Sequence, residues 1–282
     1  MARVEHVKRL LEKYGFDDQR TAEWHLKRGQ MLTASEIYKG LADATPAQRH
    51  ELIMSKLVPR EQTPGQGARA LLWGTRFEPI AKKIYCELQY KIHIADTTCI
   101  PHPEVPFLGA SPDGIILTDN LEDKRYGKLV EFKCPISRQF TDQTPVPDAY
   151  FHQMQLQMEC SGIDECEYIE MQFKPLNYTE WVDCTAPYKS FYMIDENGKV
   201  IYKDYNDRTP IAEWREKYVE EDKEYTTVYW MLNNWRSVTV KKQPNWLSQH
   251  LPSLTAIWQE VLQHRQNNTV PEHPKEKSTL LI

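Results

Sequence analysis

The sequence predicts an α/β fold that is followed by a mostly helical C-terminal extension. Two observations indicate the α/β part: one long stretch of helical periodicity over 70–90, and short apolar runs typical of strands between 91 and 203. Another observation distinguishes the C-terminal part of the chain, where tryptophan is concentrated in a mainly helical pattern. We therefore expect a core domain over 1–205, a helical extension over 206–265 and a polar, disordered tail over 266–282.

The N-terminal part is expected to be helical. Residues 4–14 repeat apolar side chains at helical spacing and predict a short amphipathic helix. Residues 20–43 form a second block, which changes from polar to apolar. Within it Thr33 or Ser35 precedes a short apolar stretch, and a hydroxyl in this place typically caps a helix.

A loop and a long helix come next. Prolines and glycines at 59–67 predict the loop. Over 70–90 the apolar residues fall on one helical face, which predicts a helix packed against the core. Apolar runs bounded by turn residues then predict strands near 92–94, 114–117, 129–133, 167–173 and 180–184.

Two further elements complete the predicted core. Residues 148–160 carry apolar side chains at helical spacing. Residues 191–203 consist of two alternating runs around the dipeptide Asn197-Gly198, which is a strong signal of a β-hairpin.

The composition is that of an ordinary soluble globular chain, with 40% hydrophobic and 27% charged residues. No run approaches the roughly 20 apolar residues of a membrane span, and the charged N-terminus lacks the apolar centre of a secretory signal. We therefore expect an intracellular protein with no membrane partner. Six cysteines without a C-x-x-C pair predict reduced thiols. The net charge of −5 disfavours a general nucleic-acid coating protein, but not an enzyme with one basic groove.

The most informative residues are a Pro-Asp-Gly segment ending at Gly114 and the strand segment Glu131-Phe132-Lys133. Carboxylates on adjacent strands can hold one Mg²⁺, which prefers hard oxygen ligands, so Asp113 and Glu131 are candidate ligands. Residues two apart on a strand face the same side. Lys133 therefore projects beside Glu131, while Phe132 points into the core and offers only its backbone carbonyl. Phosphodiester hydrolysis needs an activated water and charge stabilisation, which a metal and an ammonium can supply. The joint pattern argues against mere surface charges.

Four more polar side chains are candidates for the same site. Glu78 lies at the edge of the apolar stripe of the long predicted helix and is expected to act as a further metal or water ligand. Tyr150, Gln153 and Gln157 share one face of the next predicted helix, where a hydroxyl and two amides can hold a metal-bound water or a phosphate. The alternative for each residue is a solvated polar helix face.

These residues resemble a known family, the phage lambda exonuclease and YqaJ-like viral recombinase nucleases of the PD-(D/E)xK superfamily, over roughly 20–175. The resemblance consists of five motifs in the family's order: Trp24-His25 with Arg28 and Thr33-Ala34-Ser35-Glu36; Trp73-Gly74 with Glu78; Ser111-Pro112-Asp113-Gly114; Glu131-Phe132-Lys133-Cys134-Pro135 with Ser137-Arg138 and Phe140; and Ala149-Tyr150 with Gln153-Met154-Gln155. The number and order of the motifs make the resemblance specific.

The resemblance implies a restriction-endonuclease-like core, in which helices flank a central mixed sheet. It implies a 5′-to-3′ exonuclease that digests one strand of duplex DNA from a free end in recombination or replication. The implied cofactor is Mg²⁺, with Mn²⁺ able to substitute, bound by Asp113, Glu131 and the Phe132 carbonyl. Lys133 and Glu78 would activate water.

The resemblance also implies a site for the substrate. Arg28 and Ser35, with Thr33 beside them, would hold the terminal 5′-phosphate, a role suited to a guanidinium fork and a hydroxyl. Arg138 would be a second phosphate contact, Tyr150 and Gln157 would also bind the DNA, and Gln153 would belong to the catalytic group. The implied partner is duplex DNA with free ends. It remains open whether a single-strand annealing protein is a further partner and whether the chain forms a homo-oligomer. For a viral chain a nuclear location also remains open.

Two other functions remain open as well. An endonuclease of the same fold, acting on RNA or structured DNA as herpesvirus alkaline nucleases do, would have a similar metal site, but Arg28 with Ser35 favours recognition of an end. A catalytically dead nuclease fold that only binds nucleic acid would be expected to lose a carboxylate or the lysine. All three carboxylates and the lysine are present here.

Overall fold

The structure is a computed structural model that describes residues 2–16, 19–58, 66–220 and 223–274. Its helices are α1 (Ala2–Tyr14), α2 (Ala22–Gly29), the 3-10 helix η1 (Ala34–Gly40), α3 (Pro46–Leu57), α4 (Gln66–Leu88), α5 (Asp148–Ser161), α6 (Tyr178–Asp183), α7 (Ile211–Tyr218) and α8 (Trp246–Asn267). Its strands are β1 (Leu32–Thr33), β2 (Ile92–Ala95), β3 (Ile100–Pro101), β4 (Leu108–Ala110), β5 (Gly114–Thr118), β6 (Leu129–Lys133), β7 (Glu165–Leu176), β8 (Lys189–Asp195), β9 (Val200–Tyr202) and β10 (Tyr225–Lys241).

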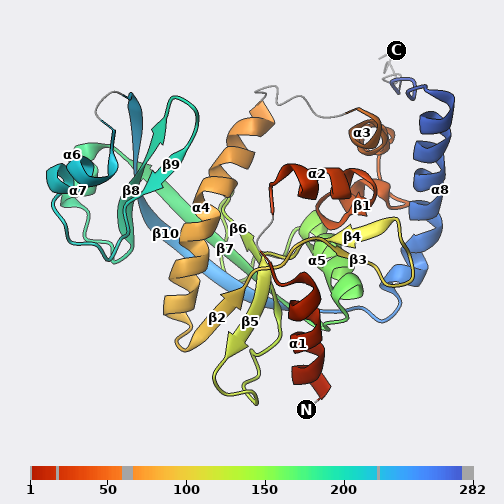
Figure 1. The fold of residues 1–282 in the computed structure, drawn as a ribbon, viewed down its shortest axis with the longest axis horizontal. Coiled ribbons are helices and arrows are strands. Elements are labelled where there is room, and N and C mark those ends of the chain that lie inside the picture. Colours follow the sequence, from red (N-terminus) through yellow and green to blue (C-terminus); the bar gives the residue numbers. More distant parts are fainter. Residues whose placement is uncertain (1, 17–18, 59–65, 221–222, 275–282) are drawn as a thin grey trace.

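Within the described residues, a seven-stranded sheet has the order β2-β5-β6-β7-β10-β8-β9, and a three-stranded sheet has the order β1-β4-β3. In the larger sheet β6 and β7 run parallel, whereas the other neighbours run antiparallel. Figure 1 shows α4 crossing one side of this sheet. The predicted α/β fold, with a central mixed sheet flanked by helices, is confirmed.

The two faces of the sheet bury two different cores, and β6 shows the alternation between them. Leu129 packs in the core formed with α1, η1, α3, α5 and α8, whereas Val130 and Phe132 pack in the core formed with α4. In the second core Phe77 of α4 is fully buried and stacks on Phe173 of β7, with ring centroids 4.3 Å apart. Helices α4 and α5 therefore cover opposite faces, and Phe132 points into the core as predicted.

Most of the predicted elements are present. The structure confirms the helices expected over 4–14, 70–90 and 148–160, the strands near 92–94, 114–117, 129–133 and 167–173, and the hairpin over 191–203. In the block over 20–43, Thr33 precedes η1, and its backbone N–H donates to the Glu36 side chain at 3.2 Å. The loop expected at 59–67 falls mainly on 59–65, outside the described residues, and Gln66 already begins α4.

The strand predicted at 180–184 is wrong, because this segment forms the short helix α6. Asn177 Oδ1 accepts the Glu180 N–H at 2.9 Å, and Glu180 Oε2 accepts the Asn177 N–H at 2.8 Å. This reciprocal capping box satisfies two backbone donors at the start of the helix. The local polar pair therefore outweighs the strand-like pattern of the residues that follow it.

The mostly helical extension predicted over 206–265 contains α7 and α8 but also the longest strand, β10. This strand lies between β7 and β8, so the boundary predicted at 205/206 cuts through one sheet. Its sequence is rich in β-branched and aromatic residues, a strand signal that the tryptophan content obscured. Of the tail predicted over 266–282, the first two residues complete α8, and 275–282 lie outside the described residues.

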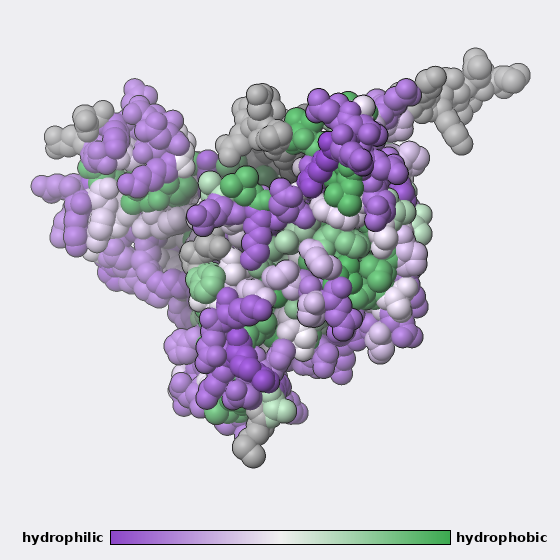
Figure 2. All heavy atoms as spheres, turned by 45° about the vertical axis from the view of Figure 1, so that its right-hand side comes forward, coloured by the Kyte–Doolittle hydropathy of each residue, from purple (hydrophilic) through white to green (hydrophobic). Residues whose placement is uncertain are grey.

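The tryptophans of the C-terminal part fill three cores. Trp230 packs in the α4 core, and Trp246 and Trp258 pack in the α5 core. Trp214 belongs to a third, small core with Phe191, which joins α6, α7, β8 and β9 into a lobe. Figure 1 shows this lobe at the left, and in Figure 2 a notch in the mainly hydrophilic surface sets it off from the body.

The structure also bears on the expectations about membrane spans and cysteines. Among the described residues no helix has the length and apolar character needed to traverse a bilayer. All six cysteines lie in the described part of the chain as free thiols, and four of them are buried.

Candidate active site

The site is built where β5 and β6 separate. Their ladder ends at the pair Gly114–Val130. Beyond this pair the Phe132 N–H donates to Asp113 Oδ2 at 2.7 Å instead of to a strand. Because the N–H and C=O of one strand residue point to the same side, the Phe132 carbonyl also faces Asp113. Gly114 has φ +153°, and a Cβ there would lie 2.4 Å from Ile94 Cγ2, so this turn requires glycine.

Helix α5 fixes the carboxylate of Glu131. This side chain is 2% exposed. Gln153 Nε2 donates to Glu131 Oε1 at 2.7 Å, and Gln157 Nε2 donates to Glu131 Oε2 at 2.6 Å. The Lys133 ammonium pairs with Glu131 Oε1 at 2.5 Å and donates to Gln153 Oε1 at 3.1 Å. Both glutamines therefore face the site, and the alternative of a solvated helix face is wrong for them.

The charges of the cluster are strongly interdependent. Burial, and next the nearby carboxylates of Glu131 and Glu78, raise the pKa of Asp113 well above its usual range. Burial by itself lowers the pKa of Lys133, but the carboxylates of Glu131 and Asp113 outweigh it, so this pKa lies above its ordinary value. The lysine stays protonated at neutral pH. Asp113 and Glu131 together carry more negative charge than the one ammonium of Lys133 offsets, and a bound cation would neutralise this excess.

The donor atoms suit a hard divalent cation. Asp113, Glu131 and the Phe132 carbonyl present oxygen ligands of the kind that Mg²⁺ prefers. Among the described residues no group of three or more His, Cys, Asp or Glu side chains is arranged around a metal position. Two carboxylates and the Phe132 carbonyl are the groups that would hold such a cation here.

Glu78 approaches the cluster from α4 but has a partner of its own. Arg20 Nη2 lies 2.5 Å from Glu78 Oε2, and the Glu78 side chain is 23% exposed. The structure therefore does not bring Glu78 into a shared metal group, and it acts on Asp113 through its charge. Arg20 was not predicted, because no spacing rule connects it to a residue 58 positions away.

Tyr150 lies between two cations of the site. Its ring centre is 4.4 Å from Lys133 Nζ and 5.5 Å from the Arg138 guanidinium carbon. Arg138 is paired with the buried carboxylate of Glu170 and donates to the Tyr168 hydroxyl at 3.2 Å. Its Nη1 is buried without a hydrogen-bond partner among the described residues. Arg138 and Lys133 thus contact the same ring, and the role of Arg138 as a second phosphate contact remains a prediction.

A buried arginine, Arg236, binds the same carboxylate as Arg138. Arg236 of β10 donates from Nε to Glu170 Oε2 at 2.7 Å, and its carboxylate partner is fully buried. The sequence did not predict either residue, because only the pairing of β10 with β7 brings them together.

The predicted phosphate-binding residues come together at the end of α2. Arg28 Nη2 donates to Ser35 Oγ at 2.8 Å and to Thr33 Oγ1 at 3.1 Å. The guanidinium carbon lies 4.2 Å from the centre of the Trp24 ring, a cation–π contact. The three residues predicted to contact the terminal phosphate therefore form one cluster.

Ser111 joins this cluster to the carboxylate cluster. Its hydroxyl accepts from Arg28 Nη1 at 3.3 Å and from Trp24 Nε1 at 3.2 Å. Ser111 precedes Asp113 by two residues in the same turn. The sequence predicts no role for Ser111 beyond its place in the Ser-Pro-Asp-Gly motif, because its contact with Arg28 is a tertiary one.

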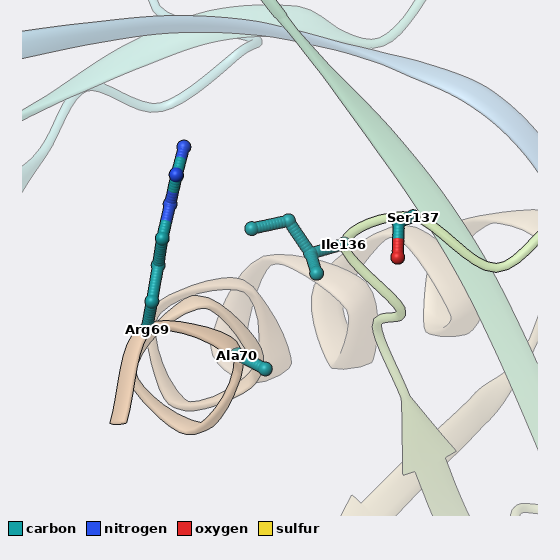
Figure 3. A pocket seen from close by; sticks show the side chains of 4 residues that line it. All are labelled: Arg69, Ala70, Ile136 and Ser137. Carbon is teal, nitrogen blue, oxygen red and sulfur yellow. The ribbon is translucent and has the colours of Figure 1, made fainter. Parts of the chain in front are cut away.

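A recess of about 340 Å³ opens beside these clusters, lined by Arg69, Ala70, Ile136 and Ser137. Figure 3 shows that it lies between the start of α4 and the loop after β6. Its lining comes from the segment that follows Lys133, so the recess adjoins the site and is not part of the carboxylate cluster.

Comparisons with known proteins agree with this fold and these motifs. Residues 23–164, half of the chain, match the YqaJ-like viral recombinase domain. An uncharacterised protein of Acanthamoeba polyphaga mimivirus is 26% identical over 183 residues, which cover 62% of this chain and 32% of that protein. The chain therefore spans about a third of the length of the curated relative it matches.

Two solved structures are similar in fold. An alkaline exonuclease from Laribacter hongkongensis has a TM-score of 0.52 and 20% identity, over 88% of this chain and 96% of that chain. The same enzyme in complex with dAMP has a TM-score of 0.50 and 20% identity, over 88% and 98% of the two chains. The family match spans half of the chain and takes in the motifs from Trp24 to Gln157. The chain belongs to the YqaJ-like viral recombinase family.

Proposed function

We propose that this protein is a Mg²⁺-dependent deoxyribonuclease, and specifically a 5′-to-3′ exonuclease that degrades one strand of duplex DNA from an end. The observation that carries the proposal is the position of Ser111. Its hydroxyl accepts hydrogen bonds from Arg28 and Trp24, and two residues later Asp113 contacts the backbone of β6. One short turn thus joins a cluster suited to a phosphate to a cluster suited to a metal.

The chain's own residues have distinct roles in the proposed hydrolysis. Asp113, Glu131 and the Phe132 carbonyl would hold a divalent cation, which when bound supplies a more acidic water and neutralises charge on the phosphodiester. The two glutamine amides keep Glu131 in one orientation. Lys133 remains charged beside this carboxylate, where it orients the attacking water or stabilises charge that develops on the phosphoryl oxygens.

The Arg28 cluster supports end recognition. A terminal phosphate carries more charge than an internal diester, and a guanidinium fork can bind two of its oxygens. Arg28 is held between the Trp24 ring and three hydroxyls from two segments of the chain, those of Thr33 and Ser35 and that of Ser111. The structural neighbour that is named an alkaline exonuclease supports an exonuclease over an endonuclease of the same fold.

The first prediction tests this end recognition. Wild-type protein with Mg²⁺ is expected to digest duplexes with 5′-phosphate ends at least roughly tenfold faster than duplexes with 5′-hydroxyl ends, the factor that about 1.4 kcal/mol of charge-assisted binding provides. Arg28→Ala should bring the ratio of the two rates close to one. The rates are measured on linear duplexes labelled at the 5′ or the 3′ end.

Arg9→Ala, which removes an exposed arginine of α1, controls for the loss of one positive charge. Omission of Mg²⁺ and a closed circular DNA complete the comparison. Equal wild-type rates on the two kinds of end would refute end recognition. Rapid cutting of the closed circle would instead establish an endonuclease.

A further inference from the structure

Helix α2, which carries Arg28, is held almost entirely by polar contacts. None of its eight residues is buried. At its N-terminus the Thr21 hydroxyl accepts the Trp24 N–H at 3.2 Å, and Lys27 Nζ donates to the Cys99 carbonyl at 2.8 Å. A helix this short is marginal without packing of an apolar face. The position of the Arg28 guanidinium therefore depends on the groups that bind the helix backbone.

Two cations from distant parts of the chain bind the last carbonyls of α2. Lys56 Nζ of α3 donates to the Arg28 carbonyl at 3.4 Å. Arg265 Nη2 of α8 donates to the Gly29 carbonyl at 2.8 Å and to the Lys56 carbonyl at 2.9 Å. The last carbonyls of a helix lack partners within the helix and carry partial negative charge, so cations there stabilise it. Arg265 thus joins the ends of α2 and α3.

The same network extends to the other residues of the phosphate cluster. Lys56 is paired with the Glu36 carboxylate. Glu36 Oε1 accepts from the Thr33 hydroxyl at 2.8 Å, and that hydroxyl accepts from Arg28 at 3.1 Å. A movement of Arg265 would therefore change the support of Arg28 directly through α2 and indirectly through Thr33.

Helix α8, which carries Arg265, is packed firmly against the core. Leu254, Ile257 and Val261 of this helix are fully buried in the α5 core. The Arg265 guanidinium carbon lies 5.3 Å from the centre of the Trp258 ring. Figure 1 shows α8 running beside α3, and it lies well outside the segment 23–164 that matches the family.

We infer that Arg265 is a positioning residue for recognition of the 5′-terminal phosphate, through which the C-terminal helix holds α2 and its Arg28 in the binding geometry. The inference rests on the proposed function and assigns a role in it to α8. Arg265 itself touches neither the carboxylate cluster nor the phosphate-binding hydroxyls. Its removal should therefore affect the selection of ends and leave the chemistry intact.

The test compares Arg265→Ala with a control on the same helix. Ser253→Ala removes another hydrogen bond from α8 to a backbone carbonyl, that of Gly40 at 2.8 Å, which lies outside α2. In Arg265→Ala the ratio of rates on 5′-phosphate and 5′-hydroxyl ends should fall roughly two- to tenfold, the effect of losing one or two hydrogen bonds. The change should appear in the KM for 5′-phosphate ends, with kcat unchanged.

Arg265→Lys keeps a cation but loses the fork that spans two carbonyls, so its ratio should lie between those of the wild type and Arg265→Ala. If circular dichroism shows that Arg265→Ala does not fold, the ratio of rates measured with Arg265→Lys tests the inference by itself. The inference would be refuted if the ratio of rates on 5′-phosphate and 5′-hydroxyl ends were the same in the Arg265 variants, Ser253→Ala and the wild type. It would also be refuted if Ser253→Ala lowered this ratio as much as the Arg265 variants do. Failure of Arg28→Ala to change the ratio would refute the proposed function itself, and the inference with it.

Discussion

At the scale of single residues, the buried carboxylate of Glu131 organises the site. Burying a charge costs free energy unless the charge is paired and hydrogen-bonded. Both oxygens of Glu131 accept an amide hydrogen bond, and one also pairs with Lys133. Asp113 is instead surrounded by other carboxylates and has only a backbone N–H and the lysine to offset them. A cation would be the missing partner of Asp113.

We expect Asp113→Ala or Glu131→Ala to abolish cleavage, because each removes a carboxylate on which binding of the metal depends. Digestion of labelled linear duplex at saturating Mg²⁺ measures the effect, and circular dichroism checks that the fold is retained. Turnover near the wild-type rate in either variant would show that the site assignment is wrong.

Lys133→Ala should lose two or more orders of magnitude in rate, about the effect of removing one positioned electrostatic group. Binding of the metal should survive, since the ammonium is not a ligand. Single-turnover rates and calorimetry with Mg²⁺ or Mn²⁺ separate the two effects. Disappearance of metal affinity in this variant would contradict the role given to the lysine.

At the scale of elements, α5 connects the site to α8 through a pair of histidines. Trp246 Nε1 donates to His152 Nδ1 at 2.9 Å, and the His152 and His250 ring centroids are 5.4 Å apart. His152 directly precedes Gln153, which binds Glu131. Packing of α8 therefore supports the helix from which Glu131 is oriented.

This contact predicts a pH dependence of stability. Burial lowers the pKa of both His152 and His250, with the second ring adding to the effect on His152, while Asp43 and Asp148 oppose it. The unfolded chain then binds more protons than the folded one between the folded and unfolded pKa values. The contribution of these histidines to the free energy of unfolding should therefore be complete above the pKa of the unfolded chain, near 6.5. It should be lost as the pH decreases through the pKa values of the folded protein.

His152→Asn keeps an acceptor for the Trp246 N–H but does not titrate, so its thermal midpoint should fall less steeply than that of the wild type between about pH 7 and pH 5. Calorimetry of both proteins across this range measures the slopes. Parallel curves would show that His152 does not contribute to the dependence.

At the scale of the whole molecule, β10 binds the chain into one sheet. It pairs with β7 over most of its length and with β8 at its start, so the C-terminal part supplies a central strand. Its side chains also contribute Arg236 to the ion cluster beside the site and Trp230 to the α4 core. The C-terminal part therefore shares its sheet and core with the segments that carry the candidate site.

A chain that ends after Tyr205 should fail to fold, because loss of β10 leaves β7 and β8 with unpaired edges and the truncation removes residues from all three cores. We expect it to aggregate or to show no cooperative thermal transition. A chain that ends after Pro274 retains every described element and should unfold like the 282-residue chain. Cooperative unfolding of the shorter chain would support an independent domain over 1–205.

Local chemistry allowed much of this to be predicted from the sequence alone. The apolar periodicity of α4 and α5 reflects burial of one helix face, and the alternation around Phe132 reflects the geometry of a single strand. These rules depend only on neighbours along the chain. They were sufficient to predict the α/β fold and to place Glu131 and Lys133 on one side of β6, whereas the motifs were identified by their resemblance to a known family.

Only the tertiary structure decided the contacts between segments that are far apart in the sequence. Pairing with β7 and β8 makes residues 225–241 a central strand of the sheet, whereas the helix in place of the strand predicted at 180–184 follows from a capping box that is local in the sequence. The contacts of Ser111 with Arg28, of Arg236 with Glu170 and of Arg265 with Gly29 depend on the same long-range packing. Side-chain periodicity specifies which face of an element is buried, but the partner that covers that face depends on the packing of the whole chain.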